Sequence, residues 1–523
     1  MNSDSRIKVN LSLKRVQTFI FDVPRLKAML GANALIGETL RLGLTERAIA
    51  CGATPVSADG APSADAFDPL QSAEQLERDD PAWLLGQGIL ARDGGHFSAV
   101  FASKAGAMEF CTEAENLLAE ALPGVLFEIE MSAIDGQSLE EPKALAKEAF
   151  ILELPVLQIC QETGREVASK KCDKGSWAAS SVQHRMDAGD RFHAGKTRDI
   201  IGLMRRPLGL DQEAGWQAPR ELEELCDGQY LALIHADGNG VGKRYKSHRS
   251  SCTHTGLAKE CHGERFFHSM RVAVRRAVVQ ALTEVFQRQQ GVRPYEVLML
   301  GGDDLLLACR ADMALPFAQA YAQALTNYPL ADGQPLSVGI GVAIAKHSYP
   351  LHRLHALAEA LAASAKRLYR AAPEHGSVID WQIVTQSWFG DLQAQRRSAE
   401  LRRYRVGDTE ESLLLSRRPY AVPGQDGLEG LLAAVVALSQ RDQKADTILA
   451  ARTPLRALRT AFETGRLAGE MAFSRLDEGV RAILTGESST SPWVAVADHC
   501  YQTRVLDIVE LSEIARLGRR NHD

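Results

Sequence analysis

The sequence has 523 residues, of which 45% are hydrophobic and 24% charged, with a formal net charge of −6. This composition is typical of a soluble globular protein, and the length predicts three or four domains. No apolar run approaches the ~20 residues of a membrane-spanning helix, and the polar start MNSDSRIK differs from a secretory signal. The net charge limits any contact with RNA or a nucleotide to a local basic patch.

Nine cysteines are scattered along the chain. An odd number without paired spacing favours a reducing compartment over a disulfide framework. We therefore expect a cytoplasmic protein that makes no contact with a membrane.

The first 150 residues contain a pattern of strand, helix, hairpin, helix and strand. The expected elements are a strand over Ile7–Leu13, an amphipathic helix within Val23–Ile49, a hairpin over Leu90–Phe101, a helix near Ala105–Ala121 and a strand near Val125–Ser132. Residues 51–81, rich in Ala, Asp, Pro and Ser, predict a surface loop.

Residues 151–228 form a connecting region with Cys160 and Cys172. A single, widely spaced pair is a weak zinc signal, and idle thiols remain the simpler interpretation. His184 and His193 are further candidate ligands, although their spacing gives them no support.

The second pattern begins with an apolar strand over Gln229–Ala236, followed by Asp237 and the turn Gly238-Asn239-Gly240. The segment is not a P-loop, because Asp237 stands where that motif needs its first glycine, and it lacks the oxygen ligands of an EF-hand loop. What remains is a carboxylate at the C-terminal edge of a strand, beside a backbone that can approach phosphate.

Residues Lys243–Gly263 read as an irregular insertion with five basic residues and one acid, Glu260. Such a loop can bind a triphosphate or RNA, and a solvated loop explains it equally well. Cys252 and Cys261, with nearby histidines, are a second zinc candidate of irregular spacing.

Helical and strand periodicity continues through the second pattern. We expect a helix along Phe267–Val285, a hairpin over Tyr295–Arg310, a helix near Met313–Asn327, a strand over Leu336–Ile344 and a helix over Leu351–Arg370 with Lys366 and Arg367 on its outer face. Gly339 and Gly341 give the strand a face of small residues on which a helix or ligand can pack closely. Residues 386–523 are expected to form a C-terminal helical domain.

The tip of the second hairpin carries Gly301-Gly302-Asp303-Asp304. Two adjacent carboxylates without a basic neighbour repel each other, and a divalent cation between them removes that cost. A solvated turn is the simpler alternative, because Gly and Asp are common turn residues.

Strand, helix, hairpin, helix and strand is the βαββαβ plan, an antiparallel sheet backed by two helices. In that plan Asp237 lies beside Asp303 and Asp304 at one sheet edge. Three carboxylates there fit two-metal phosphoryl transfer, with Mg²⁺ or Mn²⁺ activating a ribose hydroxyl and neutralising the leaving pyrophosphate. The predicted fold is α+β: a first ferredoxin-like unit over 1–150, a linker over 151–228, a second over 229–385 and the helical region.

These motifs together resemble the large polymerase-cyclase subunit of type III CRISPR effector complexes. The resemblance is carried by Asp237 with its turn, the GGDD hairpin, and VGIGVAIAKHSYPLHRLHALAEALAASAKR; the opening LSLKRVQTFIFDVPRLKAMLGANALIGE is similar to the first palm of that family. It covers roughly residues 7–385.

The resemblance implies conversion of ATP into cyclic oligoadenylate when a complex of guide RNA and partner subunits meets target RNA. It gives the metal-binding roles to Asp237, Asp303 and Asp304, nucleotide contacts to Gly238, Asn239, Gly240, Gly301 and Gly302, and a phosphate contact to Lys366. It also implies a linker that often binds zinc, which the cysteine spacing here leaves doubtful.

The first unit departs from this pattern. It has Gly94-Gly95-His96-Phe97 in place of GGDD, and Asn10 and Ser12 on its first strand. The resemblance therefore implies an inactive palm that supplies half of a composite ATP pocket. No His-Asp dyad precedes it, so no HD nuclease activity is expected.

Two alternatives stay open. A palm-type cyclase could join GTP into a cyclic dinucleotide, although such enzymes usually end this hairpin motif in Glu-Phe. The chain could instead be a silent scaffold that binds RNA and partner subunits, which the intact carboxylates argue against.

Overall fold

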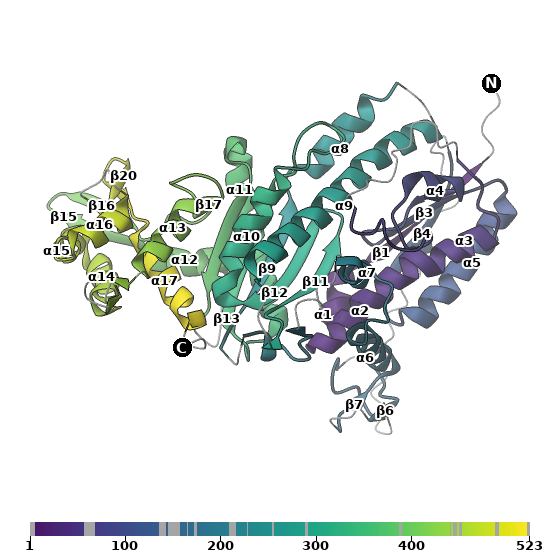
Figure 1. Ribbon diagram of the computed structural model, residues 1–523, viewed down its shortest axis with the longest axis horizontal. Helices are drawn as coiled ribbons and strands as arrows, with labels where there is room; N and C mark the ends of the chain where they lie inside the picture. Colours follow the sequence, from purple (N-terminus) through teal and green to yellow (C-terminus); the bar gives the residue numbers. More distant parts are fainter. Residues whose placement is uncertain are drawn as a thin grey trace.

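The computed structural model describes residues 6–56, 68–134, 143–144, 157–164, 166–171, 175–208, 216–226, 229–253, 256–287, 291–385, 390–439, 441–442, 447–448, 452–486 and 491–519. The molecule is elongated, with an N-terminal sheet at one end, a central sheet in the middle and the C-terminal region at the other end (Figure 1). None of the helices in the described ranges combines the length and hydrophobicity that crossing a bilayer requires.

The N-terminal unit is built on a sheet with the strand order β2-β3-β1-β4-β5. Its strands are β1 (Ile7–Lys14), β2 (Ile89–Ala91), β3 (His96–Phe101), β4 (Leu126–Ala133) and β5 (Lys143–Ala144). Its helices are α1 (Val16–Phe21), α2 (Leu26–Glu38) continued by the π-helical turn η1 (Thr39–Gly43) and α3 (Leu44–Ala50), then α4 (Pro81–Gly86) and α5 (Lys104–Ala121). Alternate residues of β1 are buried, as expected for a strand with one face on the core.

The central unit is built on a sheet with the order β11-β12-β9-β13-β14-β17. The strands are β9 (Tyr230–Gly238), β11 (Tyr295–Gly301), β12 (Asp304–Arg310), β13 (Val338–Lys346), β14 (Val378–Ile383) and β17 (Tyr420–Ala421). The helices are α8 (Val241–Ser250), α9 (Leu257–Val285), α10 (Ala311–Leu325) and α11 (Leu351–Ala371).

Both sheets place the first strand between the fourth strand and the second strand of the hairpin, in the orders β2-β3-β1-β4 and β11-β12-β9-β13. The first strand is antiparallel to both neighbours in each unit. The α+β prediction is therefore confirmed, and in each unit the tip of the hairpin lies at the edge where the first strand ends.

The small-residue face of β13 packs closely on α11, as the sequence predicted. A Cβ atom added at Gly341 would lie 2.0 Å from the carbonyl oxygen of Ala358, and one at Gly339 would lie 2.6 Å from Cγ of Lys366. Glycine is therefore required at Gly341, because a side chain there would push the helix off the sheet.

The basic segment Lys243–Gly263 is not an irregular loop. It contains α8 and the first turns of α9, which starts ten residues before the predicted helix. No helical periodicity is visible here, because α8 buries none of its residues and so has no apolar stripe.

The C-terminal region is not wholly helical. Besides α12 (Leu392–Glu400), α13 (Leu428–Leu438), α14 (Arg452–Thr464), α15 (Arg466–Ser474), α16 (Glu478–Thr485) and α17 (Val505–Arg519), it has a four-stranded sheet of β15 (Leu401–Val406), β16 (Thr409–Leu414), β20 (Val494–Ala497) and β21 (Cys500–Gln502). The hairpin β15–β16 was missed because its strands carry many charged residues, and β17 joins the central sheet across the predicted boundary at residue 385.

The connecting region packs against the N-terminal unit rather than forming a free linker. Its helices are α6 (Ser180–His193) and α7 (Ile200–Leu208). A Cβ atom at Gly31 would lie 1.8 Å from the carbonyl oxygen of Arg185, so α2 and α6 cross at very short range. The remaining short elements are β6 (Lys170–Lys171), β7 (Trp177–Ala178), β8 (Trp216–Gln217), η2 (Glu224–Cys226), β10 (Gly291–Val292), η3 (Pro373–His375), β18 (Arg441–Asp442) and β19 (Thr447–Ile448).

Candidate active site

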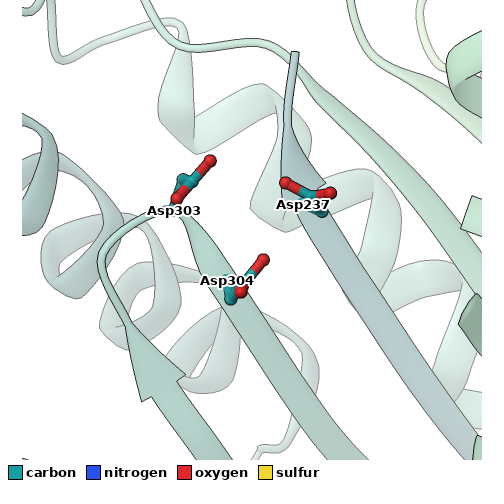
Figure 2. A group of neighbouring side chains, drawn as sticks. All are labelled: Asp237, Asp303 and Asp304. Atoms are coloured by element: carbon teal, nitrogen blue, oxygen red, sulfur yellow. The ribbon is translucent and has the colours of Figure 1, made fainter. Parts of the chain in front are cut away.

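The three predicted carboxylates come together at one edge of the central sheet. Asp237 lies near the end of β9, Asp303 lies in the hairpin turn and Asp304 begins β12, and the three side chains converge (Figure 2). One oxygen from each carboxylate lies within 4.8 Å of the others. Strand pairing causes this convergence, because Leu305 pairs with Ala236 and so sets Asp304 beside Asp237.

Two glycines shape this edge. Gly302 has φ of 61°, in the left-handed region that a hairpin turn with adjacent carboxylates requires. A Cβ atom at Gly238 would lie 2.8 Å from Oδ2 of Asp303, so a side chain there would displace the carboxylate.

Asn239 directly follows the last residue of β9. Its side chain is buried, and its Nδ2 donates to Oγ of Ser337 at 3.3 Å and to the carbonyl oxygen of Gly376 at 3.4 Å. These bonds fix the turn after β9. Gly240, with φ of 66°, caps the start of α8 instead.

The helical periodicity predicted that Lys366 lies on the outer, exposed face of α11. The structure shows instead that its side chain is largely buried. Its Nζ forms an ion pair with Oδ2 of Asp237, and its side chain is only 17% exposed. Gly339, directly beneath it, leaves the space that its stem occupies. The lysine therefore contributes one positive charge to a group of three carboxylates.

Two of the three carboxylates, those of Asp303 and Asp304, have a raised pKa. Burial, with the charge of Asp237, raises the pKa of Asp303. Burial and the charges of Asp237 and Asp303 raise the pKa of Asp304 to about 7. Such unfavourable crowding, relieved only partly by Lys366, fits a site for a hard divalent cation with oxygen ligands.

A pocket of about 880 Å³ lies between the two units, and Asp303 and Asp304 are on its wall. The N-terminal hairpin tip lines the opposite side. A Cβ atom at Gly301 would lie 3.8 Å from Cα of Gly94, so the two glycine turns face each other at van der Waals distance. Asp237 and Lys366 are not among the residues that line the pocket.

The N-terminal unit has no carboxylate at the matching positions. The two turn residues are Gly302 and Asp303 in the central hairpin and Gly94 and Gly95 in this one. Ser12 pairs with His96, which begins β3 as Asp304 begins β12, so Ser12 corresponds to Asp237, Gly95 to Asp303 and His96 to Asp304. Of Asn10 and Ser12, which the sequence analysis named on this strand, the register selects Ser12, and its Oγ lies 3.0 Å from Nδ1 of His96.

Buried charges join the two units beside the pocket. On α9, Arg271 donates to Asp79 at 2.9 Å and to Glu264 at 2.6 Å, and its Nε lies 3.5 Å from Asp93. Arg41 donates to Asp93 at 2.7 Å. Although burial opposes its ionisation, Arg271 and Arg275 hold the pKa of Asp79 well below its ordinary value.

Sequence reasoning missed this network because its members are far apart in the chain. One signal was present: Arg271 stands beside Met270 and Val274 on the apolar face of a helix, where an arginine needs a buried partner.

The zinc candidates gain no support. Among the described residues, Asp237, Asp303 and Asp304 are the sole group of three or more His, Cys, Asp or Glu close enough to share a metal. Cys172 lies outside the described residues. His262 stacks on His248 with ring centroids 4.1 Å apart, and Nε2 of each lies 3.1 Å from the other's carbonyl oxygen.

Comparison with known proteins places this site in a family. Residues 230–372 match the family model of Cas10/Cmr2, second palm domain. No curated protein sequence matches the chain.

Solved structures of a Csm1–Csm4 cassette share the fold. The complex with AMPPNP matches with a TM-score of 0.51 and 13% identity, covering 98% of this chain and 70% of that chain. The complexes with cA3 and with pppApApA each match with a TM-score of 0.51 and 12% identity over 98% of this chain, covering 70% and 69% of those chains. The resemblance seen in the sequence is thus confirmed for residues 230–372, which match the second palm of Cas10/Cmr2, and the chain shares its fold with the solved Csm1–Csm4 structures.

Proposed function

We propose that this chain is a palm-type nucleotidyltransferase that converts ATP into linear or cyclic oligoadenylate. The observation that carries the proposal is the position of Asp303 and Asp304. They lie on the wall of a pocket that both units build, and Asp237 lies close enough to share a cation with them.

The proposed reaction joins two nucleotides. A ribose hydroxyl of one attacks the α-phosphorus of the other, the bond to the pyrophosphate breaks, and the hydroxyl proton passes to solvent. Mg²⁺ or Mn²⁺ held by the three aspartates would supply Lewis-acid stabilisation of the phosphoryl oxygens. The protein itself mainly positions the reactants, because phosphoryl transfer needs little covalent chemistry from side chains.

Each unit has its own part in this arrangement. The central palm supplies the carboxylates, while Lys366 holds Asp237 in place. We propose that the N-terminal unit is a second, inactive palm whose turn at Gly94-Gly95 closes the pocket over the substrates. Enclosure strengthens the electrostatic interactions inside the site.

We propose that the chain works as a large subunit of a type III CRISPR complex in the cytoplasm, with a guide RNA, partner subunits and target RNA as the trigger. The match to the Cas10/Cmr2 palm supports this assignment. ATP as substrate is supported by the Csm1–Csm4 structures with AMPPNP and cA3, which share the fold.

The test is incubation of the purified chain, with and without candidate RNA-bound partners and target RNA, with ATP or GTP and Mg²⁺ or Mn²⁺. Products are identified by mass spectrometry, and Asp303→Ala/Asp304→Ala serves as the control. We expect oligoadenylates that disappear in the variant. Products from GTP alone would favour the cyclic dinucleotide synthase, and no product from any nucleotide with all partners present would favour the silent scaffold.

A further inference from the structure

The residue that caps the helix after the first strand of each unit adopts the same unusual conformation. In the central unit Gly240 caps α8 with φ of 66° and ψ of 15°. In the N-terminal unit Arg15 caps α1 with φ of 53° and ψ of 40°. Both angles lie in the left-handed region, which glycine adopts freely and residues with a Cβ atom do not.

An arginine at such a position needs a reason. Among the described residues, only Arg15 and His499 have a positive φ without being glycine. Glycine adopts this conformation without strain at the equivalent position in the central unit, Gly240. The arginine in the N-terminal unit therefore has a side chain that the local backbone conformation disfavours. Strain of this kind concentrates at functional sites.

Arg15 also lies on the wall of the pocket, which Asp303 and Asp304 line as well. The neighbouring Val16 lies 3.4 Å from the Cβ position of Gly95, and the turn of Gly94 meets Gly301 from the central hairpin. Arg15 therefore stands next to the N-terminal turn, in the pocket that also holds the two aspartates.

The other basic residues of the pocket wall are already engaged. Lys8 pairs with Glu260 at 3.0 Å, and Arg41 donates to Asp93 at 2.7 Å. Arg92 donates to the carbonyl oxygens of Arg41 and Leu76, and Arg271 donates to Asp79 and Glu264. Within the described part of the chain, Arg15 is the lining cation whose side chain has no hydrogen bond or ion pair.

We propose that Arg15 binds the triphosphate of a nucleotide on the N-terminal side of the pocket. This unit lacks the three carboxylates and with them the means to neutralise phosphates through a metal, so a guanidinium supplies the positive charge instead. Arginine suits this role because its planar donors match phosphate oxygens and its charge persists at all relevant pH values. The inference rests on the proposed function and names a nucleoside triphosphate as the ligand.

The test is binding of α,β-methylene-ATP, whose α–β linkage cannot be cleaved, to the full chain with Mg²⁺ by isothermal titration calorimetry. Arg15→Gly removes the charge and also relieves the backbone. We expect it to weaken binding by roughly tenfold or more, with a thermal midpoint equal to or above that of the wild type. The loss should shrink as salt is raised, because the arginine is exposed and its charge is screened.

Two variants serve as controls. His499→Gly makes the same backbone change in the C-terminal region and should leave the affinity unchanged. Arg15→Lys keeps the charge and should lose less affinity than Arg15→Gly. Binding by Arg15→Gly equal to the wild type, or no binding of the analogue by the wild type, would overturn the inference.

The outcomes also separate this inference from the proposed function. Triphosphate binding that depends on Arg15, without any product from ATP, would overturn the nucleotidyltransferase and leave the phosphate contact standing. Product formation with undiminished affinity in Arg15→Gly would do the reverse.

Discussion

The N-terminal and central units have the same strand order and a glycine turn at the hairpin tip, yet they differ at three positions. Asp237, Asp303 and Asp304 form an acidic cluster in one, and Ser12, Gly95 and His96 take their places in the other. The turn glycines Gly94, Gly95 and Gly302 have a positive φ, which the tight turns require. The comparison teaches that the glycines and the carboxylates have separate tasks: the glycines shape the turns of both units, and the carboxylates are confined to the central unit.

The largest expected difference between the units is catalytic. Asp303→Asn/Asp304→Asn removes two negative charges with little change in shape and should lower the rate of pyrophosphate release from ATP by about 10³-fold or more. The matched change in the N-terminal unit, His96→Asn, should lower that rate by less than about tenfold, since no metal ligand is lost. Equal losses in the two variants would contradict the division of roles.

The junction between the units should be the next most sensitive feature. Arg271→Met leaves Asp79 and Glu264 buried without their main partner, which should lower the free energy of unfolding by about 3–5 kcal/mol. Urea denaturation followed by tryptophan fluorescence measures the loss. Arg403→Met, at a site 66% exposed, should change stability by less than about 0.5 kcal/mol; a similar loss at both sites would show that the buried network is not special.

A second contact across the junction should respond to pH. The ring of Phe21 stacks on His355 of α11 with centroids 4.4 Å apart, and burial, together with the charge of His235, lowers the pKa of His355 to about 4. Between about pH 6.5 and 4, His355 is protonated in the unfolded chain but not in the folded chain. The free energy of unfolding therefore falls as the pH drops through this range, by up to about 3 kcal/mol.

His355→Phe keeps the stacked ring and removes the proton site. Its stability should fall less than that of the wild type over the same pH range, as measured by urea denaturation at several pH values. The side chains that face His355 are Glu359, whose Oε2 lies 3.6 Å from its Nδ1, and His235. If the stability of the variant and the wild type fell equally with pH, the acid sensitivity would come from groups other than His355.

The smallest expected effect concerns the fourth strand of each unit. β13 carries Gly341 against α11, whereas its counterpart β4 has no glycine. Gly341→Ala forces a methyl group into the space of a backbone carbonyl and should cost about 1–3 kcal/mol. Gly242→Ala, in α8 where nothing lies within 4 Å, should be neutral or slightly stabilising. Thermal unfolding of the two variants checks the contrast, and equal midpoints would refute it.

Sequence patterns predicted the parts of the fold that have regular periodicity. β13 alternates cleanly, and α9 and α11 carry apolar stripes, so each was located to within a few residues except for the start of α9. The hairpin with Asp303 and Asp304 could be paired with Asp237 because the βαββαβ plan fixes which ends of strands are neighbours.

Features that depend on tertiary contacts could not be read in the same way. α8 has no buried face, and the strands β15 and β16 carry charged residues at many positions. The helical periodicity predicts that Lys366 points outward. Its side chain reaches Asp237 because Gly339 leaves room for its stem, which the sequence pattern does not show. The pairing of Arg271 with Asp79 joins residues 192 positions apart. Arg15 stands out by its positive φ, which no sequence pattern predicts.

The most direct test of the account is a crystal structure of the chain with Mn²⁺ and a non-reactive ATP analogue, with the metal located by anomalous scattering. The account predicts manganese bound by Asp237, Asp303 and Asp304, and none at Ser12, Gly95 and His96. Manganese at the N-terminal tip, or its absence from the three aspartates with the analogue present in the pocket, would contradict the claim that one unit holds the cation and the other closes the pocket.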